Sequence, residues 1–106
     1  MLEKSIEDYL TQEIKRRGGE CIKIETPSER GWPDRLCILP YGIVFFVETK
    51  KPKGGVVSKY QNHVISRVNG LGAHAYLAHT KELVDAILKE FDKRIHNYDE
   101  GAVGDI

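Results

Sequence analysis

Two short runs rich in apolar residues, 35–39 and 43–47, flank the turn sequence Pro40-Tyr41-Gly42, and this arrangement constrains the fold more than any other part of the chain. Proline and glycine interrupt regular structure and favour turns, so the two runs are expected to pair as an antiparallel β-hairpin. Charged residues bound the hairpin at its open end. The candidate functional groups of the chain are found there.

Two carboxylates and a lysine lie at this open end. Asp34 precedes the first strand and Glu48 follows the apolar part of the second, so Asp34 is expected opposite Glu48 or Thr49. Cross-strand neighbours are roughly 4.5–8 Å apart at Cβ, which lets two carboxylates share one cation. Glu48 and Lys50 are two residues apart on one strand and therefore share a face. The pattern predicts a cation site with a lysine beside it.

Hydrolysis of a phosphodiester bond is the chemistry that these groups fit. A divalent cation can activate the attacking water, offset the charge on the phosphate and stabilise the leaving oxygen. Mg²⁺ favours one or two carboxylates with several waters, so Asp34 and Glu48 suffice, and the backbone carbonyl of Thr49 would add another oxygen. Lys50 would orient or deprotonate the water, or stabilise the pentavalent phosphate as a fixed positive charge.

Periodicities on both sides of the hairpin predict the order α-β-β-β-α-β-α, a mixed α/β domain whose central sheet is flanked by helices. Before the hairpin, Ile22 and Ile24 alternate with charged residues, as in a half-buried strand. After it, Ser58 and Gln61 have the spacing of a capping box at the start of a helix. The expected elements are helix 2–17, strand 20–25, the two hairpin strands, helix 58–70, strand 73–78 and a final helix capped by Thr80.

Length and charge limit the classes of protein to which this chain can belong. Its 106 residues suffice for one small domain, expected over 1–96, with a flexible or subunit-contacting tail at 97–106. The formal net charge is zero, which argues against a passive nucleic-acid coat but not against an enzyme whose carboxylates bind metal. No apolar run is long enough to span a bilayer and no signal-peptide pattern is present, so we expect a cytoplasmic protein without a membrane partner.

The cysteines and histidines show no metal-binding pattern. Cys21 and Cys37 fall in strand-like runs without Cys-x-x-Cys spacing, so they are expected to be buried, reduced thiols. His74 and His79 lie too far from any second pair of ligands for a zinc signature. The functional interpretation therefore depends on the cation site at the hairpin.

Four groups of residues carry a family resemblance: Gly31-Trp32-Pro33-Asp34-Arg35, Val47-Glu48-Thr49-Lys50, Gln61, and the acids of Ser5-Ile6-Glu7-Asp8-Tyr9-Leu10. In these motifs and in the order of its elements, the chain over residues 3–90 resembles the PD-(D/E)xK nuclease superfamily and, within it, the VRR-NUC (virus-type replication-repair nuclease) domains. The resemblance implies a restriction-endonuclease-like core and DNA cleavage that depends on Mg²⁺ or Mn²⁺.

The resemblance also implies roles for particular residues of this chain. These are metal binding for Asp34 and Glu48, catalysis for Lys50, the holding of a second metal ion or its waters for Glu7, and support of the site for Gln61. Glu3 lies one helical turn from Glu7 on the same face, so the choice between these two acids stays open. For Gln61, the capping box is a competing role that involves no substrate.

Polar and basic residues around the cation site are expected to contact DNA phosphates, which such groups hold regardless of sequence. They are Ser28, Arg30 and Arg35 near the site, and Lys51 and Lys53 after it. The chain shows no attached helicase or zinc module, and in this it resembles the minimal phage and bacterial members of the family. Those are similar to Holliday junction resolvases, which implies a homodimer that cuts four-way junctions in the cytoplasm of a bacterium or of a phage-infected host.

Two other functions are compatible with the sequence. One is a general nicking nuclease without preference for branched DNA, and the other is a non-catalytic nucleic-acid-binding module that kept the fold. Two facing carboxylates count against the second, because they repel each other without metal. Cleavage assays on branched and linear DNA separate these alternatives.

Overall fold

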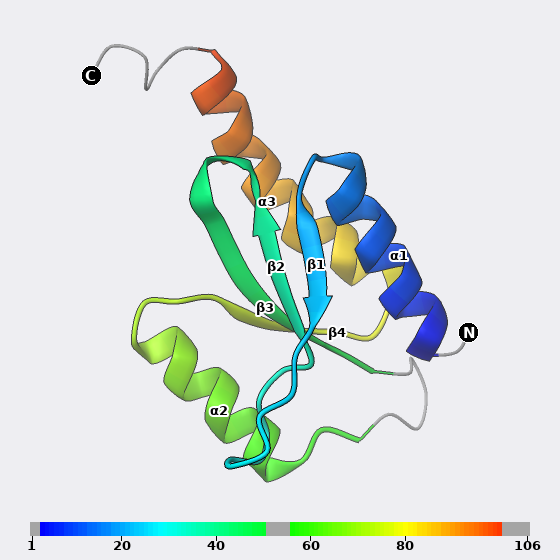
Figure 1. The fold of residues 1–106 in the computed structure, drawn as a ribbon, viewed down its shortest axis with the longest axis vertical. Helices are drawn as coiled ribbons and strands as arrows, with labels where there is room; N and C mark the ends of the chain where they lie inside the picture. The colour runs from blue at the N-terminus through cyan, green and yellow to red at the C-terminus, as the bar shows by residue number, and fades with distance from the viewer. Residues whose placement is uncertain (1–2, 51–55, 101–106) are drawn as a thin grey trace.

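The computed structural model describes residues 3–50 and 56–100 and shows one sheet with helices on both sides (Figure 1). Its strands are β1 (Glu20–Lys23), β2 (Arg35–Leu39), β3 (Ile43–Thr49) and β4 (Ala75–Ala78), in that spatial order. The first three are antiparallel neighbours, and β4 runs parallel to β3. With α1 (Glu3–Arg16), α2 (Lys59–Gly70) and α3 (Lys81–Asp99), the predicted order α-β-β-β-α-β-α is confirmed.

The central hairpin forms where the sequence predicts it. β2 and β3 pair in the register Arg35↔Val47, and a short 3-10 helix at 40–42 joins them. Two consecutive residues of this turn have positive φ, which lets the chain reverse tightly. The next pair in the same register places Asp34 opposite Glu48, which is the first of its two expected partners.

Successive residues of β3 divide the core into two clusters, because alternate side chains of a strand point to opposite faces. Phe45 is fully buried against α1 and α3 and stacks on Phe91, with 4.5 Å between ring centroids. Phe46 points to the other face and packs with Trp32 and with the apolar side of α2. Helices therefore cover both faces of the second half of β3, with α1 and α3 on one side and α2 on the other (Figure 1).

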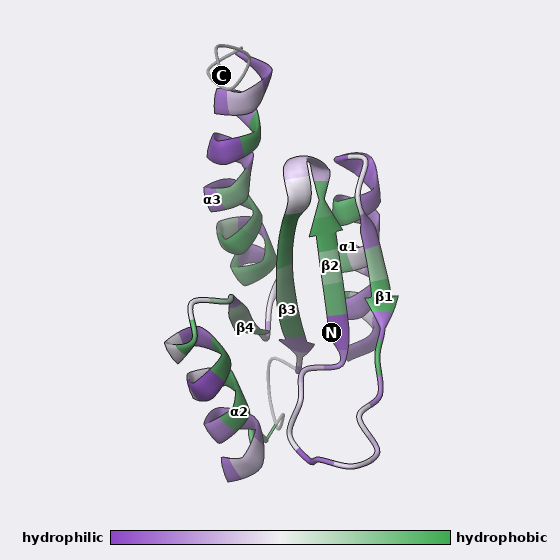
Figure 2. Cartoon of the chain, turned by 60° about the vertical axis from the view of Figure 1, so that its left-hand side comes forward, coloured by the Kyte–Doolittle hydropathy of each residue, from purple (hydrophilic) through white to green (hydrophobic). Residues whose placement is uncertain are grey.

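The outer face of β1, β2 and the first half of β3 stays apolar and exposed. Ile22, Ile38 and Val44 are 45, 37 and 45 % exposed, and Figure 2 shows no helix in front of this part of the sheet. In β1 it is Cys21, not Ile22, that packs toward the core, beside Cys37. Both cysteines are free thiols, as expected, although Cys37 is fully buried and Cys21 only partly.

The last helix extends into the segment 97–106 that the sequence predicts to be a tail. α3 continues to Asp99, past the expected domain boundary at residue 96. The remainder of the expected tail, 101–106, lies outside the described residues. Across the part of the chain that the structure describes, no helix combines the length and the apolar character needed to cross a membrane.

Candidate active site

The two carboxylates of the predicted cation site meet at the end of the hairpin. Asp34 is the last loop residue before β2, and its carbonyl accepts a hydrogen bond of 2.9 Å from the amide of Ile24. The amide of Asp34 in turn donates to Oε1 of Glu48 at 3.2 Å. Glu48 is 7 % exposed. These bonds hold both acids at the same end of the β2–β3 hairpin, as the register requires.

Asp34 carries a buried oxygen that the protein itself does not satisfy. Its Oδ1 has no hydrogen-bond partner among the described residues. Burial raises the pKa of Asp34 above its usual value, while a hydrogen bond from the backbone of Thr49 lowers it. A buried unpaired carboxylate oxygen costs free energy, so its presence calls for a ligand. A cation is the ligand that would satisfy a carboxylate there.

The pKa of Glu48 is raised as well. Burial is the largest cause, and the nearby charge of Asp34 raises the pKa further, while Lys50 opposes both effects. The Nζ atom of Lys50 lies 3.3 Å from Oε2 of Glu48, and the lysine side chain is 16 % exposed. The amide of Lys50 donates to the carbonyl of Ala78 at 3.0 Å, which fixes the end of β3 against β4. Asp34, Glu48 and Lys50 are therefore together, as the sequence predicts.

The donor set fits Mg²⁺ or Mn²⁺ rather than a softer metal. Both carboxylates are hard oxygen donors, and Asp34 Oδ1 is free to coordinate. Within residues 3–50 and 56–100, no three His, Cys, Asp or Glu side chains are placed to hold one ion together. Water and backbone oxygen would complete the coordination, and the carbonyl of Thr49 is the backbone oxygen predicted for this role.

The first-helix acid lies beside this centre on the α1 side. Oε2 of Glu7 is 3.3 Å from Nη2 of Arg35, and Oε1 accepts a hydrogen bond from the Thr49 hydroxyl at 3.4 Å. The negative charge of Glu7 contributes to the raised pKa of Asp34. Of the two acids left open by the sequence, Glu7 thus has contacts at the end of β3, whereas Glu3 belongs to the first turn of α1.

Arg35 is turned toward Glu7. Its side chain is only 15 % exposed, and its Nε is buried without a hydrogen-bond partner in the described part of the chain. A DNA contact through Arg35 stays a prediction, and it would have to use a guanidinium already held by a carboxylate. The predicted phosphate contacts Lys51 and Lys53 lie outside the described residues.

Gln61 occupies the capping box that its spacing predicts. The Ser58 hydroxyl accepts from the Gln61 amide at 3.1 Å, and Oε1 of Gln61 accepts from the Ser58 amide at 3.0 Å. The side-chain oxygen of Gln61 is therefore engaged at the start of α2. A supporting role at the active site would use the remaining NH₂ group of this side chain.

Replacing Gln61 by alanine separates the two roles. The loss of the cap is expected to cost about 1 kcal/mol of stability, as is the loss in Ser58→Ala, because each change leaves a helix-terminal amide unpaired. If Gln61 also supports catalysis, Gln61→Ala lowers kcat beyond the effect of Ser58→Ala at equal stability. Thermal unfolding and single-turnover cleavage measure the two effects. Equal kcat values in the two variants would restrict Gln61 to its cap.

The loop before Asp34 packs against α2 through contacts that sequence patterns did not predict. A Cβ on Gly31, whose φ is +93°, would lie 2.5 Å from the carbonyl carbon of Tyr60, so the two backbones touch. The guanidinium of Arg30 lies over the ring of Tyr60 at 5.6 Å. Arg67 lies 5.8 Å from the Trp32 ring centroid. The predicted DNA-contacting residues Ser28 and Arg30 are exposed on this loop, beside the first turn of α2.

Comparison with known proteins gives two informative similarities. A protein of Acyrthosiphon pisum secondary endosymbiont phage 1, named "Putative nuclease p44", is 38 % identical over 81 residues, which are 76 % of this chain and 86 % of that protein. A solved structure described as "VRR_NUC domain" matches with a TM-score of 0.77 at 28 % identity, over 82 % of this chain and 94 % of that one. No family model matches the chain.

Proposed function

The chain belongs to the VRR-NUC family of nucleases, and from this premise we propose that it is a Mg²⁺- or Mn²⁺-dependent endonuclease that hydrolyses phosphodiester bonds in DNA. One observation supports the metal dependence above all others. Oδ1 of Asp34 is buried and unsatisfied within the described structure, next to the buried carboxylate of Glu48. A carboxylate pair of this kind is stable when a divalent cation neutralises it.

Each residue of the site has a distinct part in the proposed mechanism. Asp34, Glu48 and the backbone carbonyl of Thr49 would hold the metal ion. A bound divalent ion lowers the pKa of water and offsets phosphate charge. The ammonium of Lys50, held 3.3 Å from Glu48, would orient the attacking water and stabilise the negative charge that develops on the phosphate. Glu7 would bind waters or a second ion from the α1 side.

We infer a preference for branched DNA and a homodimer from the family to which the chain belongs. A two-fold dimer places two active sites in symmetric positions, which suits paired cuts in a four-way junction. The exposed outer sheet face around Ile22, Ile38 and Val44 supports association, because such apolar surface is stabilised when a partner covers it (Figure 2). A general nicking nuclease without preference for branched DNA is the alternative.

The proposal is tested on a panel of four-way, flap, single-stranded and linear duplex DNA with Mg²⁺, Mn²⁺ or chelator. We expect cutting only with metal, fastest on the four-way junction, and slower by about 10²–10⁴-fold in Lys50→Met. Lys23→Met, which removes an exposed lysine of β1, is the matched control and should cut normally. Equal rates on junction and linear duplex would favour the nicking nuclease. Cutting unaffected by chelator would refute the metal-dependent mechanism.

A further inference from the structure

A second cluster of reactive side chains lies between β1, β2 and α1, away from the carboxylates. Cys21 and Cys37 are directly opposite in the β1–β2 register, and their Sγ atoms are 3.8 Å apart. Hydrogen-bonded and non-hydrogen-bonded pairs alternate along antiparallel strands. Since the Ile24 amide bonds to the carbonyl of Asp34 directly opposite, the two cysteines occupy a non-hydrogen-bonded position.

This position suits a covalent bond between the two sulfur atoms. Opposite Cα atoms in a non-hydrogen-bonded pair are about 4.5 Å apart, which lies within the range of about 4.4–6.8 Å seen in disulfides. The sulfur atoms already touch, so a bond requires side-chain rotation and a small approach of the two strands. β1 is an edge strand, and it can therefore move without displacing another strand of the described sheet.

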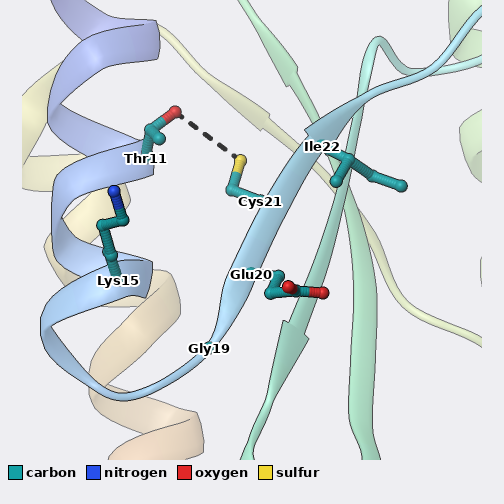
Figure 3. A pocket seen from close by; sticks show the side chains of 6 residues that line it. All are labelled: Thr11, Lys15, Gly19, Glu20, Cys21 and Ile22. Atoms are coloured by element: carbon teal, nitrogen blue, oxygen red, sulfur yellow. Dashed lines mark hydrogen bonds between the residues drawn. The ribbon is translucent and has the colours of Figure 1, made fainter.

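Only one of the two thiols is accessible. Cys21 lines an open cavity of about 250 Å³ between α1 and β1, together with Thr11 and Lys15 of the helix (Figure 3). The Thr11 hydroxyl lies 3.8 Å from the Cys21 sulfur, and it also donates a hydrogen bond of 2.9 Å to the carbonyl of Glu7. Cys37 is fully buried behind Cys21. A small reactant in the cavity can thus reach Cys21 first, and Cys37 only through it.

The surroundings also divide the chemical roles of the two thiols. The hydrogen bond with Cys37 lowers the pKa of Cys21 to about 7, with further contributions from Thr11 and from the positive charge of Arg35. The same contact, together with burial, raises the pKa of Cys37 far above its usual value. A low pKa marks an attacking thiolate, and a buried thiol of high pKa is inert until its partner is oxidised.

We propose that Cys21 and Cys37 are a redox site at which a peroxide closes an intrachain disulfide. The Cys21 thiolate attacks one oxygen of hydrogen peroxide, the O–O bond breaks, and hydroxide leaves and takes a proton to become water. Cys21 is then a sulfenic acid. The Cys37 sulfur attacks the Cys21 sulfur, the S–O bond breaks, and the OH group leaves as water with the proton of Cys37. Two thiols are oxidised and one peroxide is reduced to two waters.

The disulfide would enclose residues 22–36, a segment that contains Asp34 and the loop between β1 and β2. A cross-link of this length restricts the unfolded chain and should raise the midpoint of thermal unfolding by roughly 10 °C. Reduction with dithiothreitol should reverse this shift. The redox state of the pair would therefore set the stability of the segment that leads into the active site.

The test treats the reduced full chain with hydrogen peroxide, removes the peroxide with catalase, and counts thiols after denaturation. We expect the wild type to lose both thiols and the mass of two hydrogen atoms. The product should remain a single chain without a disulfide to a second copy, and its unfolding midpoint should rise as described above. In Cys37→Ser the reaction should stop at a sulfenic acid that dimedone traps on Cys21. In Cys21→Ser the remaining thiol should stay titratable.

Three results would overturn the proposal. The first is a wild type that keeps both thiols under conditions that oxidise Cys21 in Cys37→Ser. The second is a disulfide formed between two chains in place of the bond within one. The third is oxidation of Cys37 in Cys21→Ser at the wild-type rate, which would mean that the buried thiol needs no partner to react.

Discussion

Replacing Asp34 by asparagine is expected to slow metal-dependent DNA cleavage by about 10³-fold or more, since each factor of ten corresponds to about 1.4 kcal/mol and a bound metal supplies several. The amide keeps the size of the side chain and removes the negative charge. Because Oδ1 of Asp34 is buried and unpaired within the described residues, the variant should be at least as stable as the wild type in chelator.

Calorimetry and thermal unfolding with and without Mn²⁺ measure both halves of this prediction. Mn²⁺ should raise the unfolding midpoint of the wild type and leave that of Asp34→Asn unchanged, because a ligand stabilises only the state that binds it. Glu25→Gln removes one exposed acid of the preceding loop and serves as the charge-matched control. Normal Mn²⁺ binding by Asp34→Asn would show that the metal site lies elsewhere.

The carboxylate pair also gives the metal-free protein a characteristic pH dependence. The pKa values of Asp34 and Glu48 are raised in the folded state, so each group stabilises the fold when protonated. That contribution is complete below the unfolded pKa values and is lost as the pH rises through the folded ones. In chelator, the wild type should therefore gain more stability on acidification from neutral pH than the double variant Asp34→Asn with Glu48→Gln.

Replacing Gly31 by alanine is expected to destabilise the protein by more than about 3 kcal/mol and to lower the unfolding midpoint by more than about 10 °C. Two effects add. The φ of +93° disfavours any L side chain, and the new Cβ would lie 2.5 Å from the carbonyl carbon of Tyr60 and 2.9 Å from the Gln61 amide nitrogen. The loop must leave α2 to relieve this overlap, so Asp34, three residues later, should also lose its position.

Gly42 offers a matched control for the strain that a positive φ imposes on an alanine, without any close contact. Its φ is +73°, and a Cβ there would meet nothing within 4 Å. Gly42→Ala should therefore cost only the strain of a positive φ, about 1–2 kcal/mol, and leave cleavage intact. The difference between the two alanine variants measures the contact between the loop and α2. Equal losses in the two variants would mean that the contact is easily relieved.

The sequence predicted the parts of the fold that depend on local patterns. The turn at residues 40–42 determined the hairpin, and the hairpin determined that Asp34 faces Glu48. Ser58 and Gln61 form the predicted capping box because its partners are only three residues apart. Each of these features follows from residues close together in the chain.

Features that depend on distant contacts could not be predicted in this way. Alternation favoured Ile22 as a buried residue of the first strand, but α1 packs on the opposite face and leaves this side chain 45 % exposed. The pairing of Arg35 with Glu7 joins a strand to a helix 28 residues earlier. The contact of Gly31 with Tyr60 likewise depends on the position of α2, which no spacing in the sequence indicates.

The parallel pairing of β3 with β4 has a consequence for the nascent chain. Asp34, Glu48 and Lys50 are all synthesised before α2 and β4, yet Lys50 is held by a hydrogen bond to Ala78 in β4. Parallel strands can join only through a crossover, here α2, and such long-range pairing forms late. A chain still on the ribosome would thus carry every acid of the site without a working centre, and cutting would begin only after the crossover has closed.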